Sequence, residues 1–411
     1  MRRVAVCVRG GVVGTIAAGA LLASSNAALA GGFAVREQSA SAQGSSFAGS
    51  AAGYDLSSSF WNPAAFGIAG YGFTTESHAA LIIPHADVTG SLVGGPPCAG
   101  LPCSADIGIG ALVPGSYAAY RFNKDLVLGL SINSPFGLAT KPDPNVWQGS
   151  PIGQTSKMLT INAAPTLSYQ VAPGLFVGAG VQLEYMSLRF AFANGPGTSA
   201  IADVEDNIGV GYTAGVLWQP HQSTSIGLGF RSSVTHELEG SLSGVAPSKL
   251  PITAEFETPE IVTLSIRQAI APNLRALGTI EWTNWSRFGS IPIEGTPFSL
   301  DGNWHDGWLF AAGLEYDVSH KLTVRGGVAY EKSPIQNATE RLIQVPDSNR
   351  WWVSGGLTYR LSEKMAFDLA YTHIFFDDAP IDRSSLDGSV NFLGEADQSA
   401  DIISGSLKMK W

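Results

Sequence analysis

The chain is poor in charge, in cysteine and in long apolar runs. Charged residues make up 14% of its 411 residues, against about 25% in soluble domains. No apolar run reaches the ~20 residues that a membrane-spanning helix requires. Acidic residues outnumber basic ones, 34 to 24, which argues against a nucleic-acid partner with its negative backbone. These shortages exclude a helical membrane protein and disfavour an ordinary soluble one.

Only three cysteines are present, and two of them are close together in one long connecting segment. Cys98 and Cys103 are separated by four residues. Because the chain is expected to cross an oxidising compartment, this spacing favours a small structural disulfide loop. A metal site or a redox pair is the alternative, but two intervening residues and histidine partners would be more typical of those. We therefore expect no metal.

The N-terminus has the features of an export signal. Arg2, Arg3 and Arg9 precede the apolar stretch Gly10–Ala23, which is too short to span a bilayer. Ala28-Leu29-Ala30 then provides a small-residue cleavage site. We predict that residues 1–30 are a cleaved signal peptide, with a retained signal anchor as the alternative.

Fourteen strand-like segments follow, and the gaps between them alternate between very short and long. This alternation is typical of an outer-membrane β-barrel, in which periplasmic turns are short and outer loops are long. We predict an all-β fold, a single antiparallel barrel over residues 71–411 in a bacterial outer membrane, with both chain ends on the periplasmic side. A soluble β-sandwich is the alternative. The six short gaps are Asn123-Lys124, Ala172-Pro173-Gly174, Gln219-Pro220-His221-Gln222, Ala271-Pro272, Ser319-His320 and Ser362-Glu363.

Side chains alternate with a period of two along the later strands, which predicts their orientation. A charge on the lipid face at mid-depth costs about 2–4 kcal/mol, so Arg325, Asp368 and Lys408 should face the lumen. His373 has no serine partner at a spacing that would indicate catalysis, so we expect it to form hydrogen bonds in the lumen. Aromatic residues near strand ends fit interfacial girdles: Trp218, Trp282, Trp351 and Trp411.

Residues 31–70 do not have a strand pattern. They are rich in Ser, Ala and Gly with isolated hydrophobic residues such as Phe33 and Phe60. A fourteen-stranded barrel is wide enough to leave an open lumen, so we predict that this segment plugs it. A disordered periplasmic tail is the alternative.

Several motifs resemble a known family. Phe33–Gln38 and Ser59–Ala65 resemble the start of the FadL long-chain fatty acid transporters, and Asn62-Pro63-Ala64 matches the N-P-A motif of that family's N-terminal hatch. Segments 131–140, 282–288 and 350–356 are similar to later parts of the family, in the same order. The resemblance therefore covers the whole mature chain.

The resemblance implies passive transport of hydrophobic molecules, most of all long-chain fatty acids. Outer loops would capture the substrate, an internal site against the hatch would hold it, and a gap in the wall would release it sideways. The gap would lie at Ser134-Pro135-Phe136-Gly137, where Pro135 lacks an N–H and Gly137 permits a bulge. A strand that simply ends at Pro135 is the alternative.

Candidate substrate contacts can be named on both the outer loops and the strands. Leu138, Val146 and Trp147 could capture a hydrophobic molecule, or could pack loop against loop. Arg189 and Lys157 could contact a carboxylate, or could be solvated rim charges. Segment 301–308 contains no Lys or Arg, which leaves aromatic hydrocarbons or other neutral hydrophobic molecules as the alternative substrates.

Other classes of function fit less well. A general porin for small polar solutes would need no hatch, and a barrel enzyme such as a lipase would need a catalytic triad. No phosphate-binding loop or metal motif is present, so we expect passive transport without a cofactor. Because the spacing suggests no catalytic triad, we expect no enzyme. The expected partners are outer-membrane lipids and, through the C-terminal aromatic Trp411, the barrel-assembly machinery. We expect a monomer.

Overall fold

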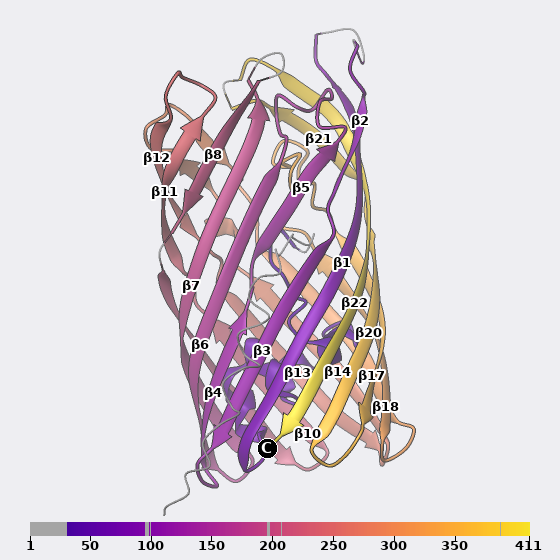
Figure 1. The fold of residues 1–411 in the computed structure, drawn as a ribbon. Helices are drawn as coiled ribbons and strands as arrows, with labels where there is room; N and C mark the ends of the chain where they lie inside the picture. Colours follow the sequence, from indigo (N-terminus) through magenta and orange to yellow (C-terminus); the bar gives the residue numbers. More distant parts are fainter. Residues whose placement is uncertain (1–30, 95–97, 99, 195–197, 207, 387) are drawn as a thin grey trace, which may run out of the picture.

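The computed structural model is a tall antiparallel barrel with its strands tilted to the axis and short helices inside it (Figure 1). It describes residues 31–411 except 95–97, 99, 195–197, 207 and 387. The predicted signal peptide lies outside the described residues. None of the described helices is long and apolar enough to cross a membrane.

The elements follow one another from short helices to strands. The helical elements are α1 (Ala40–Gln43), η1 (Ser50–Ala52), η2 (Leu56–Phe60), η3 (Pro63–Ile68) and η4 (Trp285–Arg287). The strands are β1 (Gly72–Leu92), β2 (Ser104–Gly108), β3 (Ala111–Arg121), β4 (Leu126–Asn133), β5 (Gly137–Asp143), β6 (Ser156–Ala172), β7 (Leu175–Ala193), β8 (Ser199–Glu205), β9 (Gly209–His221), β10 (Thr224–Arg231), β11 (Thr235–Ser243), β12 (Leu250–Glu257), β13 (Ile261–Ala271), β14 (Leu274–Thr283), β15 (Ser290–Pro292), β16 (Ser299–Asp301), β17 (Gly307–Asp317), β18 (Leu322–Lys332), β19 (Arg350–Arg360), β20 (Met365–Phe376), β21 (Ala379–Ser384) and β22 (Asn391–Lys410).

The closed barrel confirms the predicted fourteen strands. Six of them are each interrupted once, which gives the pairs β2/β3, β4/β5, β8/β9, β10/β11, β12/β13 and β20/β21. β1 closes the barrel by pairing antiparallel with β22 on one side and with β3 on the other. All six predicted short gaps lie at or beside tight connections, and the C-terminus lies at their end of the barrel.

The period-two pattern sorts the side chains as expected, with one correction. Arg325, Asp368 and Lys408 face the interior, where Asp368 and Arg325 are buried. His373 faces outward, so the predicted lumen position was wrong. It shares the odd-numbered face of β20 with the exposed Tyr371, and its Nδ1 is 2.7 Å from a carboxylate oxygen of Asp401.

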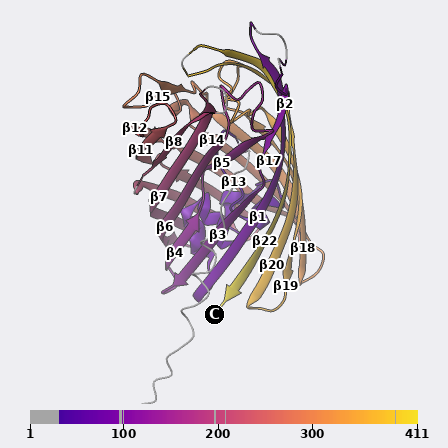
Figure 2. The same ribbon diagram turned by 45° about the horizontal axis from the view of Figure 1, so that its top comes forward.

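Residues 31–70, which we call the hatch, lie inside the barrel and are almost entirely buried. Figure 2 shows their short indigo helices within the ring of strands. Helix η3 packs against β6, β7 and β9, while α1 packs against β19 and β20. The hatch therefore contacts opposite walls of the barrel.

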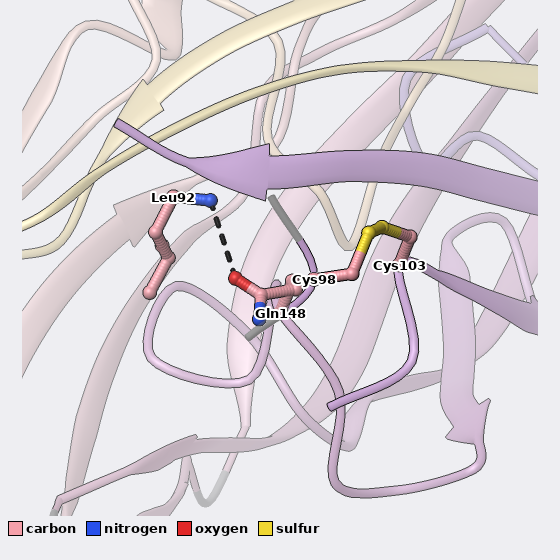
Figure 3. Close-up of a disulfide and its surroundings, with 4 residues drawn as sticks. All are labelled: Leu92, Cys98, Cys103 and Gln148. Carbon is pink, nitrogen blue, oxygen red and sulfur yellow. Dashed lines mark hydrogen bonds between the residues drawn. A yellow bond between two sulfur atoms is a disulfide. The ribbon is translucent and has the colours of Figure 1, made fainter. Parts of the chain in front are cut away.

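The long connection between β1 and β2 contains the predicted disulfide. Cys98 is bonded to Cys103, and the nearby Leu92 backbone N–H donates to Gln148 Oε1 at 3.4 Å (Figure 3). The Gln148 backbone N–H donates to the Pro102 carbonyl at 3.1 Å, so the outer loop that carries the bridge contacts the loop after β5.

Candidate functional site

An apolar cavity lies inside the outer half of the barrel, above the hatch. Its walls come from the inward faces of β6, β7, β8, β11 and β12 and from outer-loop residues, and its volume is ≈ 110 Å³. β11, β12 and β15 lie together on that side of the outer end (Figure 2). Residues of the cavity wall include Met158, Leu188, Phe190, Phe192, Val204, Leu238, Leu242, Ile252, Phe256 and Leu342.

Aromatic rings form the inner end of this cavity. Phe33, near the start of the hatch, has its ring centroid 4.5 Å from that of Trp285 and 5.5 Å from that of Trp304. Phe288 and Phe256 complete the group, at 5.7 and 5.6 Å from Phe33. Because Phe33 belongs to the hatch, movement of the hatch would change the floor of the cavity.

No charged side chain lines the cavity among the described residues, and its polar side chains are Ser156, Thr296 and Gln344. Lys157 and Arg189 alternate with the lining residues Met158 and Leu188, so both face the outside of the wall. Arg189 pairs there with Asp203 at 2.8 Å. The expectation that these two cations lie at the internal site is therefore corrected.

The three predicted capture residues are placed differently from one another. Leu138 is buried and lines the cavity. Trp147 is fully buried and packs against Phe392, with ring centroids 5.5 Å apart. Val146 is exposed and does not line the cavity. Only Leu138 is thus placed to contact a molecule in the cavity.

The wall is interrupted where Ser134, Pro135 and Phe136 separate β4 from β5. The last residue pair between β3 and β4, toward the outer end of the barrel, is Ser116↔Ile132. The part of β3 before Ser116 therefore pairs with β1 on one side and with no described strand on the other. Residues 133–140 are all buried, which breaks the alternation of a spanning strand. The chain thus turns inward at the segment predicted for the wall gap.

The inward turn is hydrogen-bonded to the hatch. The Val35 backbone N–H donates to the Pro135 carbonyl at 2.8 Å, and the Gly137 N–H donates to the Phe33 carbonyl at 2.9 Å. The Gln38 Nε2 group donates to the Ser134 carbonyl at 2.7 Å. The start of the hatch therefore satisfies backbone groups of the wall that the neighbouring strand leaves unpaired.

The N-P-A motif holds the other end of the hatch against the wall. Asn62 caps η3 by accepting from the Ala64 N–H, and its Nδ2 donates to the carbonyls of Ala51 and of Val216 in β9. The residue before the motif, Trp61, also lies directly against the wall. Glycine makes room for it there, because a Cβ at Gly229 would lie 1.7 Å from the Trp61 carbonyl oxygen.

Buried ion pairs also link the hatch to the wall. Arg36 pairs with Glu281 of β14 and, at 2.9 Å, with Glu331 of β18. Asp55 accepts from Lys408 of β22 at 2.7 Å, and Lys408 is also 2.7 Å from Asp368. A buried pair of this kind is costly to break, because removing one partner leaves an uncompensated buried charge.

The residues of the cavity wall differ in how far the sequence could predict them. Leu188, Phe190 and Phe192 alternate with polar or small residues, so an apolar lumen face near the outer end of β7 could have been inferred. Phe288, Trp304 and Leu342 are in loops, where no periodicity indicates which side chains turn inward.

A closed fourteen-stranded barrel with a hatch and an apolar internal cavity is an outer-membrane transport barrel rather than an open porin. The profile of the family "Outer membrane protein transport protein (OMPP1/FadL/TodX)" matches residues 21–411. The chain belongs to this family.

Individual relatives agree with this assignment. The long-chain fatty acid transport protein of Escherichia coli O6:H1 is 27% identical over 400 residues, which cover 85% of this chain and 88% of that protein. Outer membrane protein P1 of Haemophilus influenzae is 25% identical over 412 residues, which cover 88% of this chain and 89% of that protein.

Solved structures show the same fold. A Pseudomonas aeruginosa FadL homologue superposes with a TM-score of 0.84 at 22% identity, covering 92% of this chain and 99% of that one. The toluene transporter TbuX of Ralstonia pickettii gives a TM-score of 0.63 at 18% identity, and the match covers 90% of this chain and 97% of that one.

Proposed function

We propose that this protein passively admits neutral hydrophobic molecules, aromatic hydrocarbons among them, through the apolar cavity and the wall interruption at Ser134–Phe136. The observation that carries the proposal is the uncharged lining of the cavity. A carboxylate moved into an apolar site without a partner is strongly disfavoured, whereas a neutral molecule gains about 0.8 kcal/mol for each buried CH₂. The cavity volume of ≈ 110 Å³ is of the order of the ~150 Å³ apolar cavity that binds benzene.

Long-chain fatty acids are the second candidate. The relative in Escherichia coli O6:H1 bears their name, and an acyl tail could occupy the same apolar lining. Such a substrate requires its carboxylate to remain outside the cavity, because Lys157 and Arg189 face away from it. Neither candidate requires a chemical step, and we propose that the protein is not an enzyme.

The proposed route runs from the cavity past Phe33 to the wall. Phe136 is buried beside Phe33, with ring centroids 6.2 Å apart, and lies within the interrupted wall segment. A molecule that displaced the Phe33 side chain would therefore reach the side of the barrel without crossing the charged contacts of the hatch.

Uptake by cells that lack their own carrier tests the substrate class. Cells with and without this protein would be given a labelled aromatic hydrocarbon or a labelled long-chain fatty acid. We expect saturable, protein-dependent uptake of the hydrocarbon, with weak competition by the fatty acid. Saturable uptake of the fatty acid that the hydrocarbon does not reduce would reject the neutral substrate and favour the second candidate.

A further inference from the structure

Glu37 is a buried carboxyl group in the part of the hatch that meets the wall. The residue is 1% exposed, and neither of its carboxylate oxygens has a hydrogen-bond partner among the described residues. Buried carboxyl groups are ordinarily paired or hydrogen-bonded, because an unpaired buried charge is strongly disfavoured.

The charged groups around Glu37 are engaged with one another. Arg36 pairs with Glu281 and Glu331, and Arg350 of β19 pairs with Asp347 and Glu331. Glu331 itself repels a charge on Glu37. On β1, His78 directs its Nε2 to the Glu37 backbone carbonyl at 2.9 Å rather than to the carboxylate.

Burial therefore raises the pKa of Glu37 to about 7, although the nearby backbone N–H of Glu37 itself and the charges of Arg36 and Arg350 oppose the shift. An exposed glutamate would titrate near 4.5. The carboxyl group thus changes its charge close to neutral pH only while the hatch is docked.

Glu37 lies between the hatch groups that hold the wall interruption. Phe33 and Val35 bond to Gly137 and Pro135 on one side of it, and Gln38 bonds to Ser134 on the other. Introducing a charge at Glu37 therefore weakens the docking of the same short segment that fills the gap.

We propose that Glu37 is a positioning residue whose loss of a proton releases residues 33–38 from the wall and opens the lateral route. This inference rests on the proposed function, because it assigns a control to the same route. The docked segment is most stable below the free pKa of 4.5. Between pH 4.5 and about 7, the equilibrium constant for docking falls about tenfold per pH unit, roughly 300-fold in total. Above pH 7 it no longer changes with pH.

The release can be measured without any transported molecule. Ala34→Cys would be labelled with a maleimide between pH 4.5 and 8.5 in the full-length protein carrying Cys7→Ser, in which the two other cysteines, Cys98 and Cys103, are paired. Each rate would be divided by that of Ser362→Cys in an exposed turn, which removes the pH dependence of the reagent. We expect the normalised rate to rise at least tenfold and to level off above pH 7.

Variants at the same position separate a titration from a structural role. Glu37→Gln should give a slow, pH-independent rate, and Glu37→Asp, which keeps a carboxyl group, should restore the rise. Glu395→Gln, at an exposed position of β22, is the matched control and should behave as the wild type. A flat profile in the wild type, or an unchanged rise in Glu37→Gln, would overturn the inference.

Hydrocarbon uptake measured over the same pH range keeps the two proposals apart. Uptake that rises with the labelling rate supports both of them. Labelling that rises while no hydrophobic molecule is taken up at any pH would support the role of Glu37 and reject the proposed function.

Discussion

At the scale of single residues, neighbouring positions on one strand have opposite roles. Met158 lines the apolar cavity, whereas Lys157 points outward from the same strand, β6. Sequence parity could predict that the two side chains lie on opposite faces. It could not show that the inward face lines a closed cavity, because loop residues such as Phe288 and Trp304 complete the wall and no periodicity places their side chains.

This pair provides a direct test of the cavity. Met158→Lys places a charge in an apolar lining, which costs several kcal/mol when the charge has no partner, so hydrocarbon uptake should fall at least tenfold. Lys157→Met is the control and should remain within about twofold of the wild type. Uptake assays on barrels of equal abundance provide the measurement, and equal loss in both variants would mean that the cavity is not the route.

At the scale of elements, the hatch is held by specific contacts rather than by general packing. Its N-P-A motif was recognised in the sequence, and the Asn62 hydrogen bonds explain why that motif requires an amide at this position. The partners in the wall could not be predicted. Gly229 has no side chain to indicate a contact, and only the docked structure shows the Trp61 carbonyl against it.

Gly229→Ala should therefore displace the hatch without disturbing the barrel. The added Cβ would overlap a backbone oxygen at 1.7 Å, which neighbouring atoms cannot relieve without a backbone shift. Ion conductance through single channels in a planar bilayer should rise several-fold. Gly355→Ala, with nothing within 4 Å of its Cβ, is the control, and the idea fails if both variants conduct like the wild type.

At the scale of the whole molecule, the barrel was predictable because strand number and orientation depend on local signals. Turn residues such as Asn123 and Pro173 mark the short connections, and the period-two pattern assigns the faces. Contacts between segments far apart in the chain could not be predicted in this way, because no local pattern marks them. The inward turn at Phe136 depends on hydrogen bonds to Phe33 and Val35, about a hundred positions earlier in the chain.

The lateral route is the central claim for the molecule, and one double variant tests it most directly. Pro135→Val with Gly137→Thr supplies an N–H and two strand-forming residues, so the interrupted segment can continue its ladder and seal the wall. Uptake of a labelled hydrocarbon and its binding to the purified barrel would be measured side by side. The account predicts at least a tenfold loss of uptake with binding unchanged, and normal uptake through the sealed wall would contradict it.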